Sequence, residues 1–494
     1  MENIKKILLV VPPGMIHVQK DGTKQCKECF PPVGLAYLAA QIKGRGNYDV
    51  KVYDMVVEDF WQETVIADDT ILYGATFEQY QKVLEEYNPD LVGIQCMLSS
   101  RSNSVLELAR LTKDFNKKII VALGGHHATA LPEHVLREHT DFVVLGESDH
   151  SFPELVDTLN AGGDISRVMG IVYRGKTGEL ITQPRHDFVR NLDDLPFPAW
   201  DVLGLEKYWK GVLPMGVPLK KEKYGLVCTS RGCPHLCHYC SVPQHTGERN
   251  YRARDLDQVI GEIRWLVDRY GIEELQFTDD NFFVNLSRTK KLVRLLIKNF
   301  PGMAFAVPTG TDLTFLDFEL IDLLKEAGFH HLAMGIETGD MDLQGKYVDK
   351  KIDLNDLKSK IAYIKKAQIT TTGFFLLGFP GETLAQMKKT TNLATTLDLD
   401  YIHFIMLTPI PGSRLYDHCV QNDLLYEDFD VAQLRYSNTF IKNPNVPREV
   451  VEDLRKSVWK EYMSKRINIA EYDNRGWSQQ SKPTLPEKVS AHDS

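Results

Sequence analysis

Short apolar runs typical of buried strands alternate with helical stretches along most of this 494-residue chain. In the first half we expect strands at residues 7–11, 50–55, 90–97, 118–123 and 141–145, and helices at 34–45, 77–87 and 104–115. In the second half we expect strands at 224–229, 274–278, 303–307, 331–336, 372–377 and 401–407, separated by helices at 255–270, 288–299, 317–327, 353–367 and 383–397. Strands that alternate with helices are joined by right-handed crossovers, so the pattern predicts an α/β protein with parallel sheets.

The alternation is interrupted once, and this divides the chain into domains. Residues 1–165 predict a Rossmann-like, doubly wound parallel sheet, although no Gly-x-Gly-x-x-Gly follows the first strand. Residues 166–220 predict a linker with a hairpin and a proline-rich strap, and residues 221–412 predict a partial (β/α)6 barrel of the TIM type. Residues 413–473 predict a helical C-terminal extension, and the polar residues 474–494 a disordered tail.

Three of the eight cysteines lie on one short loop after the first strand of the second half. Cys233, Cys237 and Cys240 are separated by three and two residues, so they can hold three irons of a cubane cluster and leave the fourth iron open. An open metal position can bind a substrate. Structural zinc, with His235 or His238 as the fourth ligand, and redox thiols are the alternatives.

The cysteine spacing, with Tyr239 before the last cysteine, resembles the signature of radical S-adenosylmethionine (radical SAM) enzymes. The first 160 residues resemble the cobalamin-binding domain that precedes the radical SAM domain in one large group of these enzymes. This second resemblance rests on residues 32–38, 90–93, 124–132 and 141–147. It implies three cofactors: a [4Fe-4S] cluster, S-adenosylmethionine and cobalamin.

Cobalamin is expected at the loops that follow the strands of the first sheet, because ligands of such sheets bind beyond the carboxyl ends of the strands. The candidate contacts are Pro13, Ser99, Ser100, Gly124, Gly125, His126, Thr129, Gly146 and Glu147. The Asp-x-His-x-x-Gly motif of some cobalamin proteins is absent, and the nearest loop, residues 54–59, contains no histidine. Either no histidine ligates the lower face of cobalt, or His126 or His127 does.

The resemblance also assigns S-adenosylmethionine contacts to the ends of the later strands. Asp279 and Asp280 match the position that holds the methionine amino group, and Glu337 matches an acidic residue that contacts the methionyl or ribose part. The remaining candidate contacts are Tyr239 and Gly378 near the adenine, and Thr309. Carboxylates can accept hydrogen bonds from an ammonium group and from ribose hydroxyls. The alternative reading of these strand ends is turn chemistry and helix capping.

The activity that the resemblance implies is methylation of an unactivated carbon in a small-molecule or natural-product substrate. A 5′-deoxyadenosyl radical would remove the hydrogen, methylcobalamin would donate the methyl group, and a flavodoxin or ferredoxin would supply electrons. A radical SAM oxidoreductase or cyclase without net methylation, similar to tetrapyrrole cyclases, is the alternative. A non-catalytic corrinoid or iron-sulfur carrier is disfavoured because electron carriers normally ligate every iron. A methylthiotransferase acting on transfer RNA would need better-spaced cysteines than Cys26, Cys29 and Cys96.

Composition limits the partners and the location. The net charge of −9 argues against a large basic surface for nucleic acid. Eight cysteines in a chain of this length do not indicate a disulfide framework, and Cys26 and Cys29 form a Cys-x-x-Cys pair whose role stays open. We find no signal peptide and no run of about 18 apolar residues. We therefore expect no membrane span, a cytoplasmic location and anaerobic chemistry.

Overall fold

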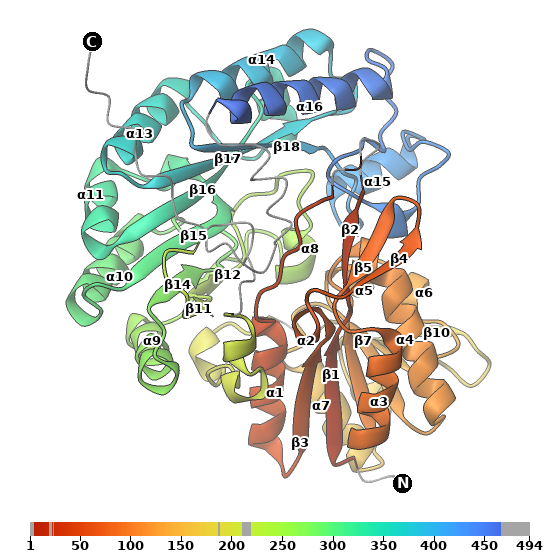
Figure 1. Ribbon diagram of the computed structural model, residues 1–494. Coiled ribbons are helices and arrows are strands. Elements are labelled where there is room, and N and C mark those ends of the chain that lie inside the picture. The colour runs from red at the N-terminus through yellow and green to blue at the C-terminus, as the bar shows by residue number, and fades with distance from the viewer. Residues whose placement is uncertain (1–3, 19–21, 23, 186–187, 210–218, 466–494) are drawn as a thin grey trace.

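Two α/β units lie side by side in the computed structural model (Figure 1). The structure describes residues 4–18, 22, 24–185, 188–209 and 219–465. The first unit is built on a seven-stranded sheet and the second on a six-stranded sheet. The predicted disordered tail, residues 474–494, and part of the predicted linker, residues 210–218, lie outside the described residues.

The first sheet has a doubly wound core of five parallel strands. In spatial order these are β3 (Asp49–Asp54), β1 (Lys6–Val11), β6 (Leu91–Gln95), β7 (Ile120–Gly124) and β8 (Phe142–Val144). Alternate residues of β1 enter two different apolar clusters, Leu9 in one and Leu8 and Val10 in the other. Both faces of the sheet are therefore buried, as the continuous apolar runs predict. The helices of this unit include α1 (Val33–Arg45), α3 (Phe77–Tyr87), α4 (Ser102–Phe115) and α7 (Ser151–Asn160).

The hairpin of the predicted linker extends this first sheet. β9 (Ile171–Arg174) pairs antiparallel with β8, and β10 (Leu180–Thr182) pairs with β9. The hairpin therefore packs as part of the first unit. A small antiparallel sheet of β2 (Gly14–His17), β5 (Thr70–Tyr73) and β4 (Glu63–Ala67) was not predicted, because its strands are short and follow breaker residues.

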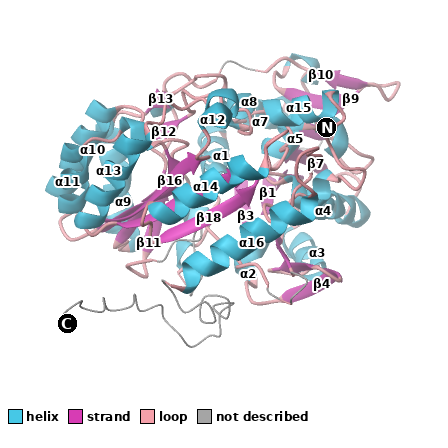
Figure 2. Cartoon of the chain, turned by 90° about the horizontal axis from the view of Figure 1, so that it is seen from above, coloured by secondary structure: helices cyan, strands magenta, loops and turns pink. Residues whose placement is uncertain are grey.

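The second sheet is an open barrel of six parallel strands in chain order. The strands are β11 (Tyr224–Val227), β14 (Glu274–Phe277), β15 (Ala304–Thr311), β16 (Phe329–Glu337), β17 (Thr370–Leu377) and β18 (Tyr401–Met406). The connecting helices are α9 (Leu256–Tyr270), α10 (Leu286–Asn299), α11 (Phe318–Ala327), α13 (Leu354–Lys366) and α14 (Leu384–Thr396). They form the outer layer in both views (Figures 1 and 2). Among the described strands β11 does not pair with β18, so the predicted partial barrel is confirmed.

Local sequence fixes the ends of these helices. Asp255 caps α9 by accepting a hydrogen bond from the Asp257 amide, and Gly271 ends that helix in a left-handed conformation. Thr383 and Gln386 form a capping box at the start of α14. None of the described helices is both long and apolar enough to cross a membrane.

The C-terminal helix packs on the barrel, and the strap contacts both units. α16 (Arg448–Ser464) lies along β18, where Trp459 donates from its indole Nε1 to the Ile402 carbonyl over 3.0 Å (Figures 1 and 2). α15 (Arg414–Gln421) precedes it. In the strap, the Tyr208 hydroxyl donates to Asp54 at the end of β3 over 2.8 Å, and Trp209 Nε1 donates to the Tyr224 carbonyl at the start of β11 over 2.8 Å. The strap is therefore hydrogen bonded to both sheets.

Candidate active site

The three cysteines of the motif lie on one loop that backbone hydrogen bonds hold in place. The loop follows the two-residue strand β12 (Ser230–Arg231) and leads into α8 (Val242–Thr246). The Leu236 amide donates to Asp349 Oδ2 over 2.8 Å, and the His238 amide donates to the carbonyl of Tyr347 over 2.9 Å. Tyr347 ends α12 (Met341–Tyr347). The loop therefore has a fixed course at the carboxyl edge of the barrel.

The chemistry of these thiols fits a bound cluster. None of the cysteines is in a disulfide, and burial raises the pKa of Cys237 to about 11 and that of Cys240 to about 12. Such thiols become thiolates at neutral pH only when a metal replaces the proton. In the described part of the chain, no three His, Cys, Asp or Glu side chains lie close enough together to hold a single metal ion.

The two histidines that the zinc alternative would need have other neighbours. His235 Nε2 lies 2.9 Å from Asp312 Oδ2, and the His238 ring packs edge-on against Tyr347 with ring centroids 5.7 Å apart. The hydrogen bond from His235 is one of the causes that hold the pKa of Asp312 below its ordinary value, against the opposing effect of burial. Both histidines therefore already have contacts of their own beside the three cysteines.

The structure separates the two predicted aspartates by their surroundings. Asp279 is fully buried and accepts three hydrogen bonds, from the Thr229 amide (3.1 Å), the Thr229 hydroxyl (2.7 Å) and the Ser230 hydroxyl (2.5 Å). Asp280 is exposed and accepts from the Gly232 amide over 2.7 Å. Desolvation by the surrounding protein raises the pKa of Asp280 to about 6. Asp279 therefore shapes the loop, and Asp280 keeps oxygen atoms available to a ligand.

Glu337 ends β16 in an unusual backbone conformation. Its φ is +70°, which is costly for a residue with a Cβ and is found mainly where function requires it. The carboxylate is buried and lies 2.6 Å from Lys350 Nζ, which also donates to the Gly335 carbonyl over 3.1 Å. A Cβ on Gly335 would lie 2.4 Å from Glu337 Oε1, so a side chain at this position would displace the pair. No sequence pattern singled out Lys350.

The turn after β17 is organised around one carboxylate. Gly378 has φ +94°, and its amide and that of Phe379 donate to Glu382 Oε2 over 2.7 and 3.0 Å. Tyr239 lies near Glu337, and burial raises the pKa of its phenol, with Glu337 and Cys237 as further causes. Thr309 donates from its hydroxyl to the Asp279 carbonyl over 3.1 Å. The predicted S-adenosylmethionine residues thus gather at the carboxyl edge of the barrel.

The predicted cobalamin loops meet at the carboxyl edge of the first sheet. Pro13 follows β1, Ser99 and Ser100 follow β6, and Gly124 ends β7. Gly125 has φ +111°, and a Cβ there would lie 2.8 Å from the Cys96 carbonyl oxygen, so the loop needs glycine.

Apolar side chains lie open at this edge, which supports a large ligand there. Met97 and Leu98 are 41% and 46% exposed at the end of β6. Exposed apolar groups beside tight loops fit a large, partly apolar ligand such as a corrin. The residues present therefore fit cobalamin.

Several polar groups of these loops are hydrogen bonded to each other. His127 uses both ring nitrogens, with Nδ1 2.8 Å from the Ser99 hydroxyl and Nε2 2.9 Å from His134 Nδ1. Thr129 Oγ1 accepts a hydrogen bond from the Gly146 amide over 2.9 Å. These contacts hold α5 (His126–Ala130) against the loops after β6 and β8. His127 therefore has no ring nitrogen left for cobalt.

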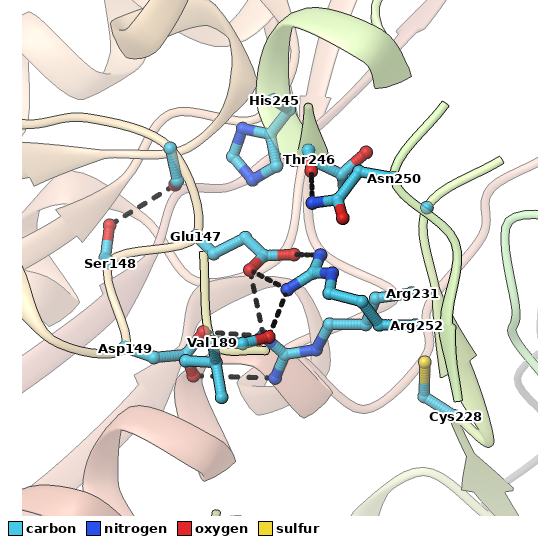
Figure 3. Close-up of polar contacts among 12 residues, drawn as sticks. Glu147, Ser148, Asp149, Val189, Cys228, Arg231, His245, Thr246, Asn250 and Arg252 are labelled. Atoms are coloured by element: carbon cyan, nitrogen blue, oxygen red, sulfur yellow. Dashed lines mark hydrogen bonds and ion pairs between the residues drawn. The ribbon is translucent and has the colours of Figure 1, made fainter. Parts of the chain in front are cut away.

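His126 and Glu147 contact the barrel unit. The ring of His126 stacks on His245 of α8 with centroids 3.8 Å apart and an interplanar angle of 17°. Burial lowers the pKa of His126 to about 4 and that of His245 as well, so both rings are neutral at physiological pH. The Glu147 carboxylate pairs with Arg252 (Figure 3). The loops expected to bind cobalamin thus also form the interface between the two units.

Tyr436, which the sequence did not single out, lies between the two sets of loops. Its side chain is 52% exposed, yet burial by surrounding protein raises the pKa of its phenol, and Glu28 and Cys240 are the charged groups close enough to add to this rise. These two further causes link Tyr436 electrostatically to the cluster loop and to the N-terminal residues around Glu28.

Two family models match the chain in the order of its two sheets. The model described as the B12 binding domain matches residues 21–156, and the model of the radical SAM superfamily matches residues 227–394. The "Uncharacterized methyltransferase PH0819" of Pyrococcus horikoshii is 32% identical over 428 residues, which cover 85% of this chain and 84% of that protein.

Two further relatives carry different activities in their names. Cytidylyl-2-hydroxyethylphosphonate methyltransferase of Streptomyces wedmorensis is 28% identical and covers 85% of this chain and 83% of its own length. Anaerobic magnesium-protoporphyrin IX monomethyl ester cyclase of Rubrivivax gelatinosus is 26% identical and covers 88% and 74%. Among solved structures, the radical S-adenosylmethionine methyltransferase TsrM of Kitasatospora setae shares the fold, with a TM-score of 0.69 at 18% identity over 95% of this chain and 90% of TsrM.

The fold, the cysteine loop and the family matches define one class of protein. The chain belongs to the radical SAM superfamily, in the group that carries a B12 binding domain ahead of the radical SAM domain. Its cofactors are a [4Fe-4S] cluster, S-adenosylmethionine and cobalamin.

Proposed function

We propose that this protein is a cobalamin-dependent radical SAM methyltransferase that methylates an unactivated carbon of a small molecule. The observation that carries the proposal is that the loops expected to bind cobalamin contact the segments on both sides of the cluster loop, through the Glu147–Arg252 ion pair and the stacking of His126 on His245. A substrate bound where these loops meet would lie between the cobalamin loops and the cluster loop. The names of the relatives PH0819 and the phosphonate methyltransferase support the same reaction class.

The residues of this chain would bind and orient the reactants. Cys233, Cys237 and Cys240 would hold three irons of the cluster and leave the fourth for S-adenosylmethionine. The Asp280 carboxylate would accept hydrogen bonds from the methionine ammonium group, and Glu337 would accept them from the ribose hydroxyls. When bound, the cluster and cobalamin supply one-electron cleavage and methyl relay, while the interface between the units excludes water.

The overall reaction balances with two molecules of S-adenosylmethionine and two electrons per product. The carbon–hydrogen bond of the substrate breaks, and its hydrogen ends on 5′-deoxyadenosine. A carbon–carbon bond forms to the methyl group, and methionine and S-adenosylhomocysteine are released. The electrons come from a low-potential protein of the flavodoxin or ferredoxin class. All eight cysteines are described and none is in a disulfide, which suits the reducing cytoplasm that we propose as the location.

The test supplies the reconstituted enzyme with a reductant, S-adenosylmethionine carrying a trideuterated methyl group, and a metabolite extract. We expect a product that gains one labelled methyl group, together with one 5′-deoxyadenosine and one S-adenosylhomocysteine per product. Labelled product that forms in the Cys237→Ser variant would refute the role of the cluster.

The cyclase is a second candidate because a cyclase matches 88% of this chain. A cyclase would form a ring or remove hydrogens from its substrate without incorporating the label. Deoxyadenosine formation that tracks a product lighter than its substrate would favour this candidate over methylation.

A further inference from the structure

Four charged side chains join the cobalamin loops to the cluster loop (Figure 3). Glu147 and Asp149 lie in the loop after β8 of the first sheet. Arg231 lies on β12, and Arg252 lies on β13 (Arg252–Ala253). We call these four residues the charge clamp.

Both arginines of the charge clamp make bidentate contacts with a carboxylate. Arg252 donates to both oxygens of Glu147 over 2.6 and 3.0 Å, and also to the Val189 carbonyl over 2.8 Å. Arg231 donates to both oxygens of Asp149 over 2.5 and 3.4 Å. Arg231 also lies 3.7 Å from Glu147, which joins the two pairs into one network. Paired donors and acceptors of this kind fix orientation as well as distance.

The charge clamp is buried. The side chains of Glu147, Asp149 and Arg252 are 8%, 2% and 7% exposed, and that of Arg231 is 16% exposed. Salt therefore screens these pairs much less than it screens surface pairs. A buried charge that loses its partner is costly, so each carboxylate and each guanidinium depends on the other unit.

The pairing register of the hairpin shows why the clamp is needed. β12 pairs antiparallel with β13, and Arg231 lies directly opposite Arg252. Like charges at opposite positions destabilise a two-stranded ribbon. The two carboxylates of the first unit supply the compensating charge, so the hairpin is stable in this form only when the loop after β8 is in place.

The same hairpin encloses the cluster loop. Arg231 precedes Cys233 by two residues, and Arg252 follows Cys240 on the returning strand. Two neighbouring contacts reinforce the position: Arg185 donates to the Gln244 and His245 carbonyls over 2.5 and 2.7 Å, and His245 stacks on His126. A Cβ on Gly146 would lie 2.5 Å from Arg185 Nη2, so the glycine allows this close approach.

We propose that Arg231 and Arg252, with Glu147 and Asp149, are positioning residues that set the distance between the cluster and cobalamin. The loop after β8 lies at the edge of the first sheet where cobalamin is expected. The cluster loop lies between the two strands of the hairpin. The charge clamp therefore fixes the position of one cofactor site relative to the other. The role in positioning the two cofactors rests on the proposed function, whereas the arrangement of the four side chains rests on their contacts alone.

The test measures the magnetic dipolar interaction between the reduced cluster and cob(II)alamin by electron paramagnetic resonance in the loaded full-length protein. The main variant is the double substitution Glu147→Gln with Asp149→Asn, which keeps shape and removes both negative charges. The matched control is Asp201→Asn, which removes an exposed ion pair with Lys43 between the first unit and the strap.

We expect the double variant to bind both cofactors but to show a weaker and broader dipolar interaction. Asp201→Asn should leave the wild-type interaction unchanged. An unaltered interaction in the double variant would overturn the proposal.

If the double variant fails to load its cluster, the same dipolar interaction is measured in the Arg231→Lys variant. Lysine keeps the positive charge but cannot contact both oxygens of Asp149. A wild-type interaction in that variant would equally overturn the proposal, and a broadened one would support it. This readout does not require methylation. Failure of the proposed function would instead appear as missing labelled product from a wild-type protein whose dipolar signal is intact.

Discussion

Glu382 gives the protein a pH dependence that one substitution should remove. Its carboxylate is fully buried and holds the turn after β17 through the Gly378 and Phe379 amides. Burial raises its pKa from 4.5 to about 7, against the opposing effect of these two hydrogen bonds. Its second oxygen, Oε1, has no hydrogen-bond partner among the described residues.

The sign follows from proton binding. Between pH 4.5 and about 7 the folded protein keeps a proton on Glu382 that the unfolded chain has lost, so stability falls as pH rises through this window. At 1.36 kcal/mol per pKa unit, a rise of about 2.5 units costs roughly 3 kcal/mol above pH 7, of which about 1 kcal/mol is already lost at pH ~5.5. Glutamine resembles the protonated acid at every pH and keeps a carbonyl oxygen for the two amides.

We expect Glu382→Gln to be more stable than the wild type, and its advantage to grow by about 2 kcal/mol between pH ~5.5 and pH ~8.5. Thermal unfolding of both proteins at the two pH values, followed by intrinsic fluorescence under anaerobic conditions, measures this growth as a shift in apparent melting temperature. The control is Glu319→Gln. Glu319 is exposed, and its hydrogen bond to Lys290 holds its pKa below the ordinary value, so no gain at high pH is expected. An advantage that is equal at both pH values, or a loss at the higher one, would refute the reasoning.

Three further substitutions test the two cofactor sites. Cys237→Ser should remove the visible absorbance of the cluster and most of the iron, whereas the control Cys419→Ser, a buried thiol away from the loop, should leave both unchanged. Gly125→Ala should reduce corrinoid retention about tenfold or more, measured after gel filtration, because a strained φ costs about 1–3 kcal/mol and the new methyl group meets the Cys96 carbonyl. Lys350→Met should weaken S-adenosylmethionine binding and destabilise the protein by about 3–5 kcal/mol, because it leaves Glu337 buried without its partner; unchanged calorimetric affinity would contradict this role.

The sequence predicted the features that depend on neighbouring residues. The cysteine spacing placed Cys233, Cys237 and Cys240 on one loop, and apolar runs placed the strands of both sheets within a few residues of their bounds. The helical extension predicted for residues 413–473 contains α15 and α16. These features follow from local periodicity and turn chemistry, which a sequence shows directly.

The features that depend on distant partners were not predictable in this way. Asp279 and Asp280 are adjacent in the sequence, but Thr229 and Ser230 bond only to the first of them. Glu147 has the appearance of a ligand-binding residue at a strand end, yet its charge is paired by Arg252 from the other unit. A sequence shows which residues carry charge, but the fold decides which charges meet.

The residues predicted to contact cobalamin also have neighbours that the sequence does not show. Gly125 and Gly146, predicted from the sequence as cobalamin contacts, have positive φ and close neighbours within the protein itself, Cys96 and Arg185. Of the two histidines left open as lower ligands of cobalt, His127 has both ring nitrogens within hydrogen-bond distance of Ser99 and His134, whereas His126 contacts His245 through the face of its ring. We therefore propose that His127 does not ligate cobalt.

The most direct test of the central claim is whether this chain itself transfers a methyl group from S-adenosylmethionine to a bound corrinoid. The anaerobically purified protein, loaded with its cluster and cobalamin, is reduced and given S-adenosylmethionine with a trideuterated methyl group, and the protein-bound corrinoid is analysed by mass spectrometry. The account predicts a retained corrinoid that carries the label, with S-adenosylhomocysteine in equal amount and 5′-deoxyadenosine that disappears in Cys237→Ser. A protein that forms 5′-deoxyadenosine but retains a corrinoid without label would contradict it.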